Sequence, residues 1–548
     1  MEPTHDNKKF FDTFLIALLL LLSSWTFFYK LGDPYFYHIR NESRRAEITR
    51  EMIETGNWII PTLEGEITLT KPPLFYWMVG FCALKSGVNE YTARIPSAVA
   101  GIGTILFTFL LGSLLFNRTI GFWSALMLMV TNIFTDQARS AEMESMLTFF
   151  ITGSIYCFFK GYRESARAKI WFPLFFIMMG LGTITKGPFA ITFPLIPIIS
   201  YLCIYRDKKI LNSSSCLFGI LLFFIILLPW PLLILKTHPH FARVVLEETI
   251  GRVTTGFAHQ EPFYFYFKNL GTALFPWIFF LPFSIAIVFS TRLAPIRREN
   301  TFLLLWFLGN LLFLSLSKSK REFYLLPVTP GFALLMGATW EAFWKWVKGK
   351  IIYPTLTIQR ACFGVGVLLV GISYVAGNPF ASNIPGTHFP HASPFLFLSG
   401  LNLLLIAAIK RFSPSLSIPT LSLTTLVVLI LVHYYLYFTY TIPIRNAYDS
   451  GKHFYLQVST LLKPSDPLAL LASNENYTFS FYAHRPVITL KEPDQMYQFM
   501  SAPGKRYLVV TERAFKKAGS LPWKIKWRGD YSEHSSWGGY LLLCNQYK

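Results

Sequence analysis

The chain opens on an apolar run at residues 10–29, FFDTFLIALLLLLSSWTFFY, and a charged stretch, YHIRNESRRAEITREM, follows almost directly at residues 37–52. Eight of the sixteen residues in the second stretch are ionisable, counting His38, whereas only 15% of the whole chain is charged. Further apolar runs follow, and 53% of the 548 residues are hydrophobic. Repeated apolar runs of about 20 residues predict a polytopic α-helical membrane protein rather than a soluble domain.

The net charge of +20 agrees with this class of protein. Basic residues gather in cytoplasmic loops and beside anionic lipid, so the charge does not predict a nucleic-acid partner. The first apolar run follows Lys8 and Lys9 and shows no small-residue cleavage site, which indicates a retained signal-anchor helix. The six cysteines have no metal-ligand spacing, and we expect them to be packing residues.

Thirteen further apolar runs could cross a membrane. They lie at residues 74–84, 93–116, 119–135, 145–160, 170–185, 187–204, 214–235, 266–289, 301–316, 323–341, 361–376, 394–409 and 418–440. With a cytoplasmic N-terminus, five basic clusters all face the cytoplasm only if one early run does not cross: Arg163/Arg167/Lys169, Arg206/Lys208/Lys209, Arg292/Arg297/Arg298, Lys345/Lys348/Lys350 and Lys410/Arg411. The cluster of Lys318, Lys320 and Arg321 then lies outside, against the positive-inside rule. The run 74–84 is short and aromatic, which is typical of an interfacial segment. The sequence therefore predicts about thirteen transmembrane helices.

This topology divides the chain into two domains. Residues 1–442 form the membrane domain, with a first extracytoplasmic loop at 32–92, and residues 443–548 lie outside. The tail alternates strand-like runs (LALLAS, RYLVVTE and GYLLLCN) with a helix-like run, DQMYQFMSA. It predicts a small extracytoplasmic α/β domain.

The charged stretch has the period of a helix from Glu42 to Thr55. Ala46, Ile48, Met52 and Ile53 form an apolar stripe, and Gly56 can end the helix in a left-handed conformation. Such a helix lies in the membrane interface. Taken alone, the pattern also suits a solvated helix that only orients the first loop.

Other exterior loops also place ionisable groups at the level of the membrane boundary, where desolvation is costly and a functional site is a common reason for them. These loops contribute Lys71; Arg139, Glu142 and Glu144; Arg243, Arg252 and His259; and Lys318, Lys320 and Arg321. Cations around a carboxylate suit a reaction with a lipid phosphate as leaving group. The cations stabilise the departing phosphate, and the carboxylate takes a proton from the incoming hydroxyl.

Several stretches resemble one family. They are NESRRAEITREMIETGNWIIPTLEGEITLTKPPLFYW, QARSAEMESMLTFF, GLGTITKGP, HQEPFYFYFKNLGTALFPW and LSKSKREFYLLPVTPGFALL. In order and chemistry they are similar to the membrane-embedded GT-C glycosyltransferases of the ArnT and protein-mannosyltransferase group, in particular the bacterial aminoarabinose–lipid A transferases. The resemblance implies a polyprenyl-phosphate-sugar donor, an outer-leaflet acceptor such as lipid A or another glycolipid, and a bacterial inner-membrane enzyme whose active site and tail face the periplasm.

Three positions depart from the family pattern. The family's first motif begins with Asp-Glu, but here the pair is Asn41-Glu42, and an amide cannot act as a general base. The second acidic position of the family is Glu144 here. The family's Glu before KPP, which contributes to a divalent-metal site, is Thr70, so a metal is not firmly expected although His259 is retained.

The resemblance and the charge pattern together assign roles to thirteen residues. For catalysis we expect Glu144 as the general base, Glu42 as the second candidate, and Asn41 beside it. For substrate binding we expect Lys71, Arg44, Arg139, Lys186, Arg252, His259, Lys318, Lys320, Arg321 and Tyr324. Each of these could instead have a structural role: Lys71 and Lys186 as interface lysines, His259 in a hydrogen bond, and the 318–324 segment as a capped turn.

Other classes of function stay open at this point. A protein O-mannosyltransferase would use the same donor chemistry but typically has an additional lumenal sugar-binding domain, which a tail of this length cannot hold. A transporter would place ionisable pairs at mid-membrane and show repeats, whereas here these residues lie at the ends of the runs. A catalytically impaired lipid-binding homologue agrees with Asn41.

Overall fold

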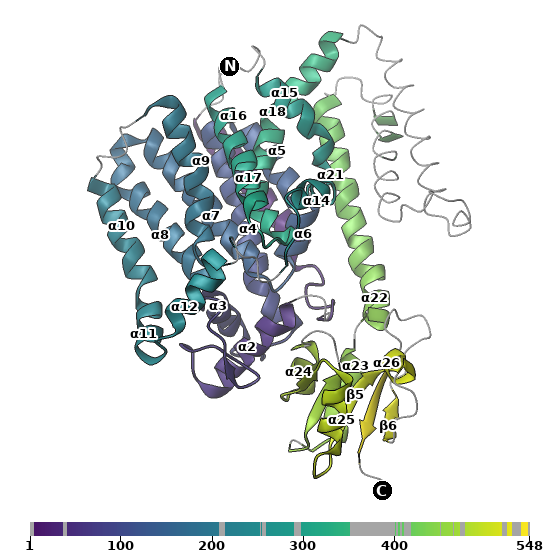
Figure 1. Cartoon of the computed structure of the whole chain (residues 1–548). Coiled ribbons are helices and arrows are strands. Elements are labelled where there is room, and N and C mark those ends of the chain that lie inside the picture. Colours follow the sequence, from purple (N-terminus) through teal and green to yellow (C-terminus); the bar gives the residue numbers. More distant parts are fainter. Residues whose placement is uncertain are drawn as a thin grey trace.

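The computed structural model describes residues 5–36, 41–207, 214–251, 254, 259–289, 297–350, 401, 404–405, 408–409, 418–449, 451–463, 465–471, 477–517, 523–528 and 539–545. These residues form a large bundle of helices with a smaller unit of strands and helices at one end, close to the C-terminus (Figure 1). Helices suit a membrane because each backbone N–H and C=O finds its partner within its own helix.

The first loop is built around a short helix and a hairpin. Helix α1 (His5–Phe28) leads into α2 (Glu42–Thr55), strands β1 (Thr62–Leu63) and β2 (Glu66–Ile67), and α3 (Leu74–Ala83). The predicted bounds of α2 are confirmed, and Gly56 ends it with a left-handed φ of 68°. Three of the four predicted stripe residues, Ala46, Ile48 and Met52, are buried.

The rest of the bundle consists of helices joined mostly by short turns. In chain order they are α4 (Glu90–Leu115), α5 (Arg118–Met129), α6 (Asn132–Ala138), α7 (Met143–Arg163), η1 (Ser165–Arg167), α8 (Ala168–Lys186), α9 (Phe189–Tyr205), α10 (Ser214–Leu227), α11 (Pro229–Thr237), α12 (Phe241–Leu246), η2 (Glu247–Gly251), α14 (Phe265–Ala273), η3 (Trp277–Phe280), α15 (Leu281–Val288), α16 (Arg297–Leu304), η5 (Leu305–Gly309), α17 (Asn310–Leu316), η6 (Glu322–Val328), α18 (Thr329–Lys350), α21 (Ile418–Leu436), η8 (Tyr437–Thr441) and α22 (Ile442–Asp449). Helix α7 packs against both α4 and α8, and α18 packs against α5.

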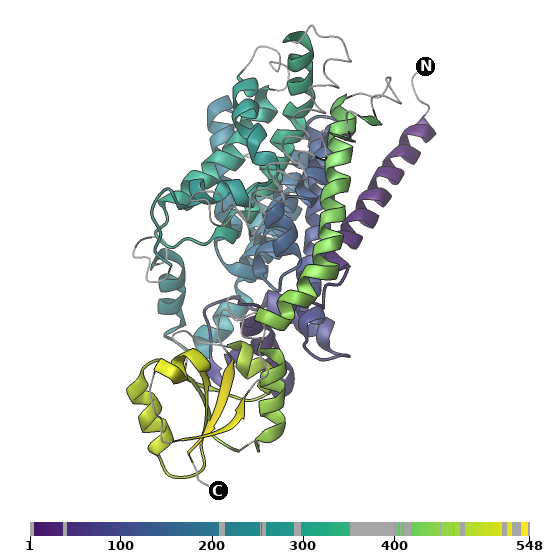
Figure 2. The ribbon, with the colours of Figure 1, turned by 90° about the vertical axis from the view of Figure 1, so that its right-hand side faces the viewer.

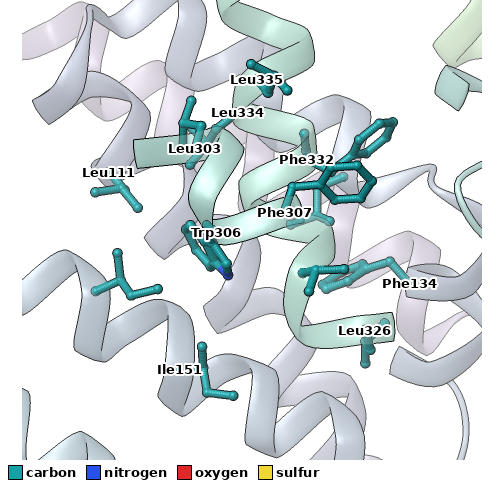
Figure 3. Close-up of a cluster of buried hydrophobic side chains, with 14 of the residues drawn as sticks. Leu111, Phe134, Ile151, Leu303, Trp306, Phe307, Leu326, Phe332, Leu334 and Leu335 are labelled. Carbon is teal, nitrogen blue, oxygen red and sulfur yellow. The ribbon is translucent and has the colours of Figure 1, made fainter. Parts of the chain in front are cut away.

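Aromatic and aliphatic side chains fill the interior of the bundle. Figure 3 shows Trp306, Phe307 and Phe332 packed among leucines from neighbouring helices. The rings of Phe307 and Phe332 lie with their centroids 5.4 Å apart, and the indole N–H of Trp306 donates to the carbonyl of Pro327 at 3.0 Å. A buried indole that has found an acceptor carries no unsatisfied donor into the apolar interior.

Seven helices in the described part of the chain are long and apolar enough to cross a membrane, or eight if the bent pair 265–286 is one span. The protein is therefore a multi-pass membrane protein. Helix α3 has only 10 residues, about 15 Å of rise against a hydrocarbon core of about 30 Å. The predicted spans 361–376 and most of 394–409 lie outside the described residues, and the count of thirteen stays a prediction.

The C-terminal unit contains α23 (Lys452–Leu461), β3 (Leu468–Leu471), α24 (Tyr477–Ala483), β4 (Ile488–Leu490), α25 (Pro493–Ser501), β5 (Tyr507–Thr511), α26 (Glu512–Lys517), β6 (Lys524–Arg528) and β7 (Tyr540–Cys544). The five strands form one sheet in the order β4-β3-β5-β7-β6. Strands β4, β3 and β5 are parallel, and β7 pairs antiparallel with both β5 and β6. The three strand-like runs and the helix-like run of the tail are strands and a helix.

The C-terminal unit packs directly on the first loop. Both lie at the same end of the bundle, and one buried hydrophobic cluster contains side chains from α2, α3 and the C-terminal sheet and helices. The hydroxyl of Tyr482 accepts the backbone N–H of Phe36 at 2.8 Å and lies 2.8 Å from Glu90 Oε1. The hydroxyls of Ser43 and Thr478 are 2.9 Å apart. These contacts hold α2 in place.

Candidate functional site

A cavity of about 70 Å³ lies where α2, α7, α8 and the turn before η6 meet. Its walls bring together residues from five separate parts of the sequence. They are Asn41, Arg44, Arg45, Lys71, Tyr76, Glu144, Lys186, Arg321, Phe323 and Tyr324. Seven of the thirteen residues predicted from the sequence are in this set. We call this space the reaction cavity.

Glu144 is the carboxylate in the wall of the reaction cavity. It lies in the first turn of α7 and is 1% exposed. Lys186 Nζ, at the last turn of α8, donates to Glu144 Oε1, while Oε2 is buried without a hydrogen-bond partner among the described residues. Burial alone would raise the pKa of Glu144, but the Lys186 ammonium and the Arg45 guanidinium hold it below its ordinary value. Glu144 thus has one oxygen fixed and one available.

Lys186 also contacts an aromatic wall of the cavity. Its Nζ lies 4.4 Å from the centroid of the Tyr324 ring and 5.7 Å from that of Phe323. An ammonium over an aromatic face gains about 0.5–2 kcal/mol. The lysine therefore has two reasons to stay beside Glu144.

A second ion pair stands next to the first. Arg45, on α2, reaches Glu142 with a distance of 2.6 Å between its guanidinium nitrogen and Oε2. Burial raises the pKa of Glu142 to about 7, although the Arg45 guanidinium opposes the shift. Glu144, Lys186 and Arg45 therefore form one side of the cavity, and Glu142 pairs with Arg45 behind this wall.

Lys71 and Arg321 stand at the mouth of the cavity, each with a partner from a loop. Lys71 Nζ donates to the carbonyl of Thr70 at 3.1 Å and to Glu248 Oε2 at 2.5 Å. Glu248 belongs to the segment η2, far from Lys71 in the sequence. The guanidinium of Arg321 contacts His259 Nε2. Lys71 thus reaches the cavity from the first loop, and Arg321 reaches it from the turn before η6.

The structure places two of the predicted residues in a different cavity. Glu42 is buried and accepts from Arg94 at 2.8 and 3.0 Å and from the backbone N–H of Ala141 at 2.8 Å. Arg139 donates to the carbonyls of Thr26 and Tyr29, both at 2.7 Å. Glu42 and Arg139 line a cavity of about 280 Å³ beside α21 and η8, and neither lines the reaction cavity. The contacts of Glu42 fasten the first loop to the bundle, and those of Arg139 join the end of α6 to the end of α1.

The remaining predicted residues also lie outside the walls of the reaction cavity. The Lys320 ammonium donates to the carbonyls of Glu261, at 2.9 Å, and Ser317. Lys318 is exposed, and its carbonyl accepts from the backbone N–H of Glu261. His259 reaches the cavity only through Arg321, and Arg252 lies outside the described residues.

Two further spaces adjoin the reaction cavity. A small apolar slot of about 10 Å³ shares Glu144, Lys186 and Tyr324 with it and continues between Leu147, Phe189, Phe193, Leu314 and Pro327. A groove of about 470 Å³ shares Arg44 with it and runs between the β1–β2 hairpin and residues 486–489 of the C-terminal unit. The reaction cavity therefore adjoins one apolar slot and one groove lined by both polar and apolar residues.

The chain is similar in sequence to known proteins. A family model described as dolichyl-phosphate-mannose-protein mannosyltransferase matches residues 17–245. An undecaprenyl phosphate-alpha-4-amino-4-deoxy-L-arabinose arabinosyl transferase of Pseudomonas savastanoi is 31% identical over 368 residues, 66% of each chain. One of the same description from Yersinia enterocolitica is 31% identical over 59% of this chain and 58% of its own length. The alignments thus span less than two thirds of these relatives.

The solved structure of ArnT from Cupriavidus metallidurans bound to undecaprenyl phosphate has the same fold. It superposes with a TM-score of 0.76 over 97% of this chain and 98% of its own, at 17% identity. The chain is similar in sequence and in fold to the ArnT and protein-mannosyltransferase group. The fold expected from the resemblance, a GT-C fold, is that of ArnT.

Within this group, the chain departs from the family pattern at the positions where a metal is expected. His259 Nε2 contacts the Arg321 guanidinium, and Thr70 offers no charged ligand. No cluster of three His, Cys, Asp or Glu side chains suited to a metal occurs in the described part of the chain. The residues present do not fit a divalent metal.

Four residues that the fold brings to the site were not predicted from the sequence. Arg45, Tyr76 and Phe323 line the reaction cavity, and Glu248 holds Lys71. For Arg45 a signal existed, because it follows Asn41 by four residues and so lies on the same face of α2. Glu248 carries no such signal, because only the folded chain brings it to Lys71.

Proposed function

We propose that the chain is a membrane glycosyltransferase that moves a sugar from a polyprenyl-phosphate donor to an outer-leaflet acceptor, lipid A or another glycolipid. One observation carries the proposal: the reaction cavity gathers five cations around one buried carboxylate. Glu142 and Glu248 pair with two of these cations, so among these residues two positive charges remain in excess. That excess suits a phosphate.

The neighbouring spaces support a lipid-linked donor. The apolar slot next to Glu144 and Lys186 gives the cavity an apolar side, and we assign the start of the polyprenyl chain to that side, with its phosphate at the cations. The slot must widen when the donor binds, because a volume of about 10 Å³ is too small for an isoprene unit. The groove beside Arg44 leads from the reaction cavity to the exterior face of the C-terminal unit. We assign it to the acceptor, since its mixed lining of Glu64, Thr68 and Tyr477 suits a hydroxyl-bearing group.

In the proposed reaction, the acceptor hydroxyl attacks the anomeric carbon of the donor sugar. A new carbon–oxygen bond forms to the acceptor, and the bond between the anomeric carbon and the phosphate oxygen breaks. The hydroxyl proton passes to Glu144 Oε2, which has no other partner among the described residues. Lys71, Arg44 and Arg321 stabilise the charge that develops on the leaving polyprenyl phosphate.

The finer topology belongs to the same proposal. We infer thirteen crossings, a membrane domain of residues 1–442, an exterior domain of residues 443–548 and a location in a bacterial inner membrane with the active site facing the periplasm. The contact between the first loop and the C-terminal unit supports this, because it places both on one side of the membrane. The chain between them must then cross an even number of times, so the total with α1 is odd.

The test compares lipids from cells with and without the gene by mass spectrometry. We expect a sugar-sized mass increase on lipid A or another glycolipid only where the gene is intact, and transfer from a polyprenyl-phosphate sugar by the purified protein in vesicles. No mass change in any glycolipid and no use of the donor would overturn the proposal.

The match to a protein-mannosyltransferase model favours one second candidate, transfer to a hydroxyl on a protein. Glycopeptide mass spectrometry on the same cells separates the two candidates, because a modified Ser or Thr peptide would replace the modified lipid. An impaired homologue would bind polyprenyl phosphate and transfer nothing until Asn41→Asp restores a carboxylate.

A further inference from the structure

Arg45 is the cation of the reaction cavity that the charge pattern of the sequence did not single out. It lies on α2 one residue after Arg44 and four after Asn41. Its side chain is 11% exposed, so it is not a solvated surface arginine. An arginine buried to this degree needs partners for its donors.

Two of its three nitrogens have partners in the protein. One terminal nitrogen donates to the backbone carbonyl of Asn41 at 3.1 Å, and the other lies 2.6 Å from Glu142 Oε2. The remaining Nε–H is buried without a hydrogen-bond partner among the described residues. An unsatisfied buried donor costs about 1–3 kcal/mol, and a charged one costs more.

Other residues of the same cavity also have buried polar atoms without partners among the described residues. The Nε atoms of Arg44 and Arg321 are likewise buried without partners among the described residues, and so is Glu144 Oε2. The cavity volume of about 70 Å³ leaves room for a small polar group between these residues. Three donors on cations and one anionic acceptor around one space suit a ligand that has anionic oxygens next to a hydroxyl.

We propose that Arg45 binds the donor substrate: its Nε–H donates to a phosphate oxygen of the polyprenyl-phosphate sugar, while Glu142 and the Asn41 carbonyl hold the guanidinium in place. This inference rests on the proposed function. Arg45 then contacts the leaving group directly, and Glu142 is a positioning residue. The Asn41 carbonyl and the ion pair with Glu142 hold the other two nitrogens and so fix the direction of the Nε–H, which a flexible lysine could not do.

The same helix supplies a matched control. Arg50 is 13% exposed and pairs with Glu47 at 2.5 Å, so its burial and its partner are like those of Arg45. It lies on the side of α2 that faces α24, where it contacts His484 Nδ1 at 2.7 Å. Its Nε, like that of Arg45, is buried without a hydrogen-bond partner among the described residues, but it lies 3.6 Å from Glu54. Arg50 does not line the reaction cavity. A purely structural role for a buried α2 arginine predicts the same behaviour from both residues.

The experiment measures binding of undecaprenyl phosphate to the full-length protein in detergent, and then transfer from a polyprenyl-phosphate sugar. Arg45→Lys should weaken binding and raise the KM for the donor by about 10–100-fold, the range of a charge-assisted hydrogen bond, with a smaller change in kcat. Arg50→Lys should leave both within about twofold. Unchanged binding and KM in Arg45→Lys, or equal losses in the two variants, would overturn the inference.

Two further measurements distinguish a failure of the proposed function from a failure of the role of Arg45. Wild-type protein that does not bind undecaprenyl phosphate at all would defeat the proposed function itself, whereas wild-type binding with no effect of Arg45→Lys defeats only the role of Arg45. If Arg45→Lys does not fold, Arg45→Ala is tested with added methylguanidinium. Saturable recovery of binding that Arg50→Ala does not show supports the inference, and no recovery in a folded Arg45→Ala contradicts it.

Discussion

At the scale of single residues, the charged groups of the exterior loops look alike in the sequence but have different roles in the fold. Glu42 and Glu144 both stand at positions where the family pattern has an acidic residue. Glu42 has Arg94 and a backbone N–H as partners, whereas one oxygen of Glu144 is left for a ligand. Both carboxylates are buried, and each lies beside a cation. Only the direction of the side chain separates a structural ion pair from a site residue, and the sequence does not contain that direction.

The general base gives the first prediction. Glu144→Gln keeps the size of the side chain and removes its basicity, so transfer should fall by about 10²–10⁴-fold. Asn41→Asp should leave activity similar or raise it, because it restores a carboxylate at the cavity. The measurement is the initial rate of transfer in vesicles, with the exposed Glu54→Gln as the control. Full activity in Glu144→Gln would remove Glu144 from the mechanism.

The partner of Lys71 gives the second prediction. Lys71→Ala should sharply reduce transfer, since it removes a charge worth a few kcal/mol to the leaving phosphate. Glu248→Gln should instead tighten donor binding, because Glu248 holds Lys71 at 2.5 Å and a phosphate must replace it. Its neighbour Glu247, paired with Arg243 on the surface, is the control. Weaker donor binding in Glu248→Gln would show that Glu248 positions Lys71 rather than competing with the donor.

At the scale of elements, α2 could be predicted from its sequence to the residue, because an amphipathic period and a glycine C-cap are local signals. Most predicted apolar runs are helices, but the run 119–135 is divided between α5 and α6. The reaction cavity was only partly predictable. Seven of its ten lining residues were predicted, whereas Arg45, Tyr76 and Phe323 lie in the same family motifs and were not singled out, because only the fold brings their side chains to the cavity.

Helix α2 has a pH-sensitive group on the face opposite the cavity. Burial raises the pKa of Glu47 to about 7, although the neighbouring Arg50 opposes the shift. A carboxyl whose pKa is higher in the folded state than in the unfolded state binds more protons when folded, so its contribution to stability is lost as pH rises from about 4.5 to about 7. The apparent melting temperature should fall over this window, and Glu47→Gln should flatten the fall. An identical pH profile in the variant would contradict the assignment.

The contact between α2 and α24 gives a further prediction at this scale. Thr478→Val removes the hydroxyl that lies 2.9 Å from Ser43 and leaves a buried polar group unpaired, a loss of about 1–3 kcal/mol. We expect a lower apparent melting temperature and reduced transfer, because α2 carries Arg44 and Arg45. Thr460, an exposed residue bonded only to its own helix, supplies the control as Thr460→Val. Unchanged transfer with lowered stability would mean that the contact holds the fold but not the site.

At the scale of the whole molecule, the packing of the C-terminal unit on the first loop restricts the membrane topology more than the sequence does. Hydropathy alone offers fourteen runs and leaves open which of them cross, since the short run at α3 is apolar enough to count. The fold adds a constraint that no local pattern contains. The first loop and the C-terminal unit share one hydrophobic cluster, so both must lie on the same side of the membrane.

The last prediction follows from that constraint. An odd number of crossings, with a cytoplasmic N-terminus, puts the C-terminal unit outside together with the first loop, and thirteen crossings put the end of α18 inside. A topology reporter fused after Lys350 should therefore read cytoplasmic, and one fused after Tyr448 should read exterior. A reporter inserted at Gly65, in the hairpin of the first loop, is the internal standard and should agree with the one after Tyr448. Agreement of all three would mean that the count after α18 is wrong, whereas opposite readings at Gly65 and Tyr448 would contradict the packing of the C-terminal unit on the first loop.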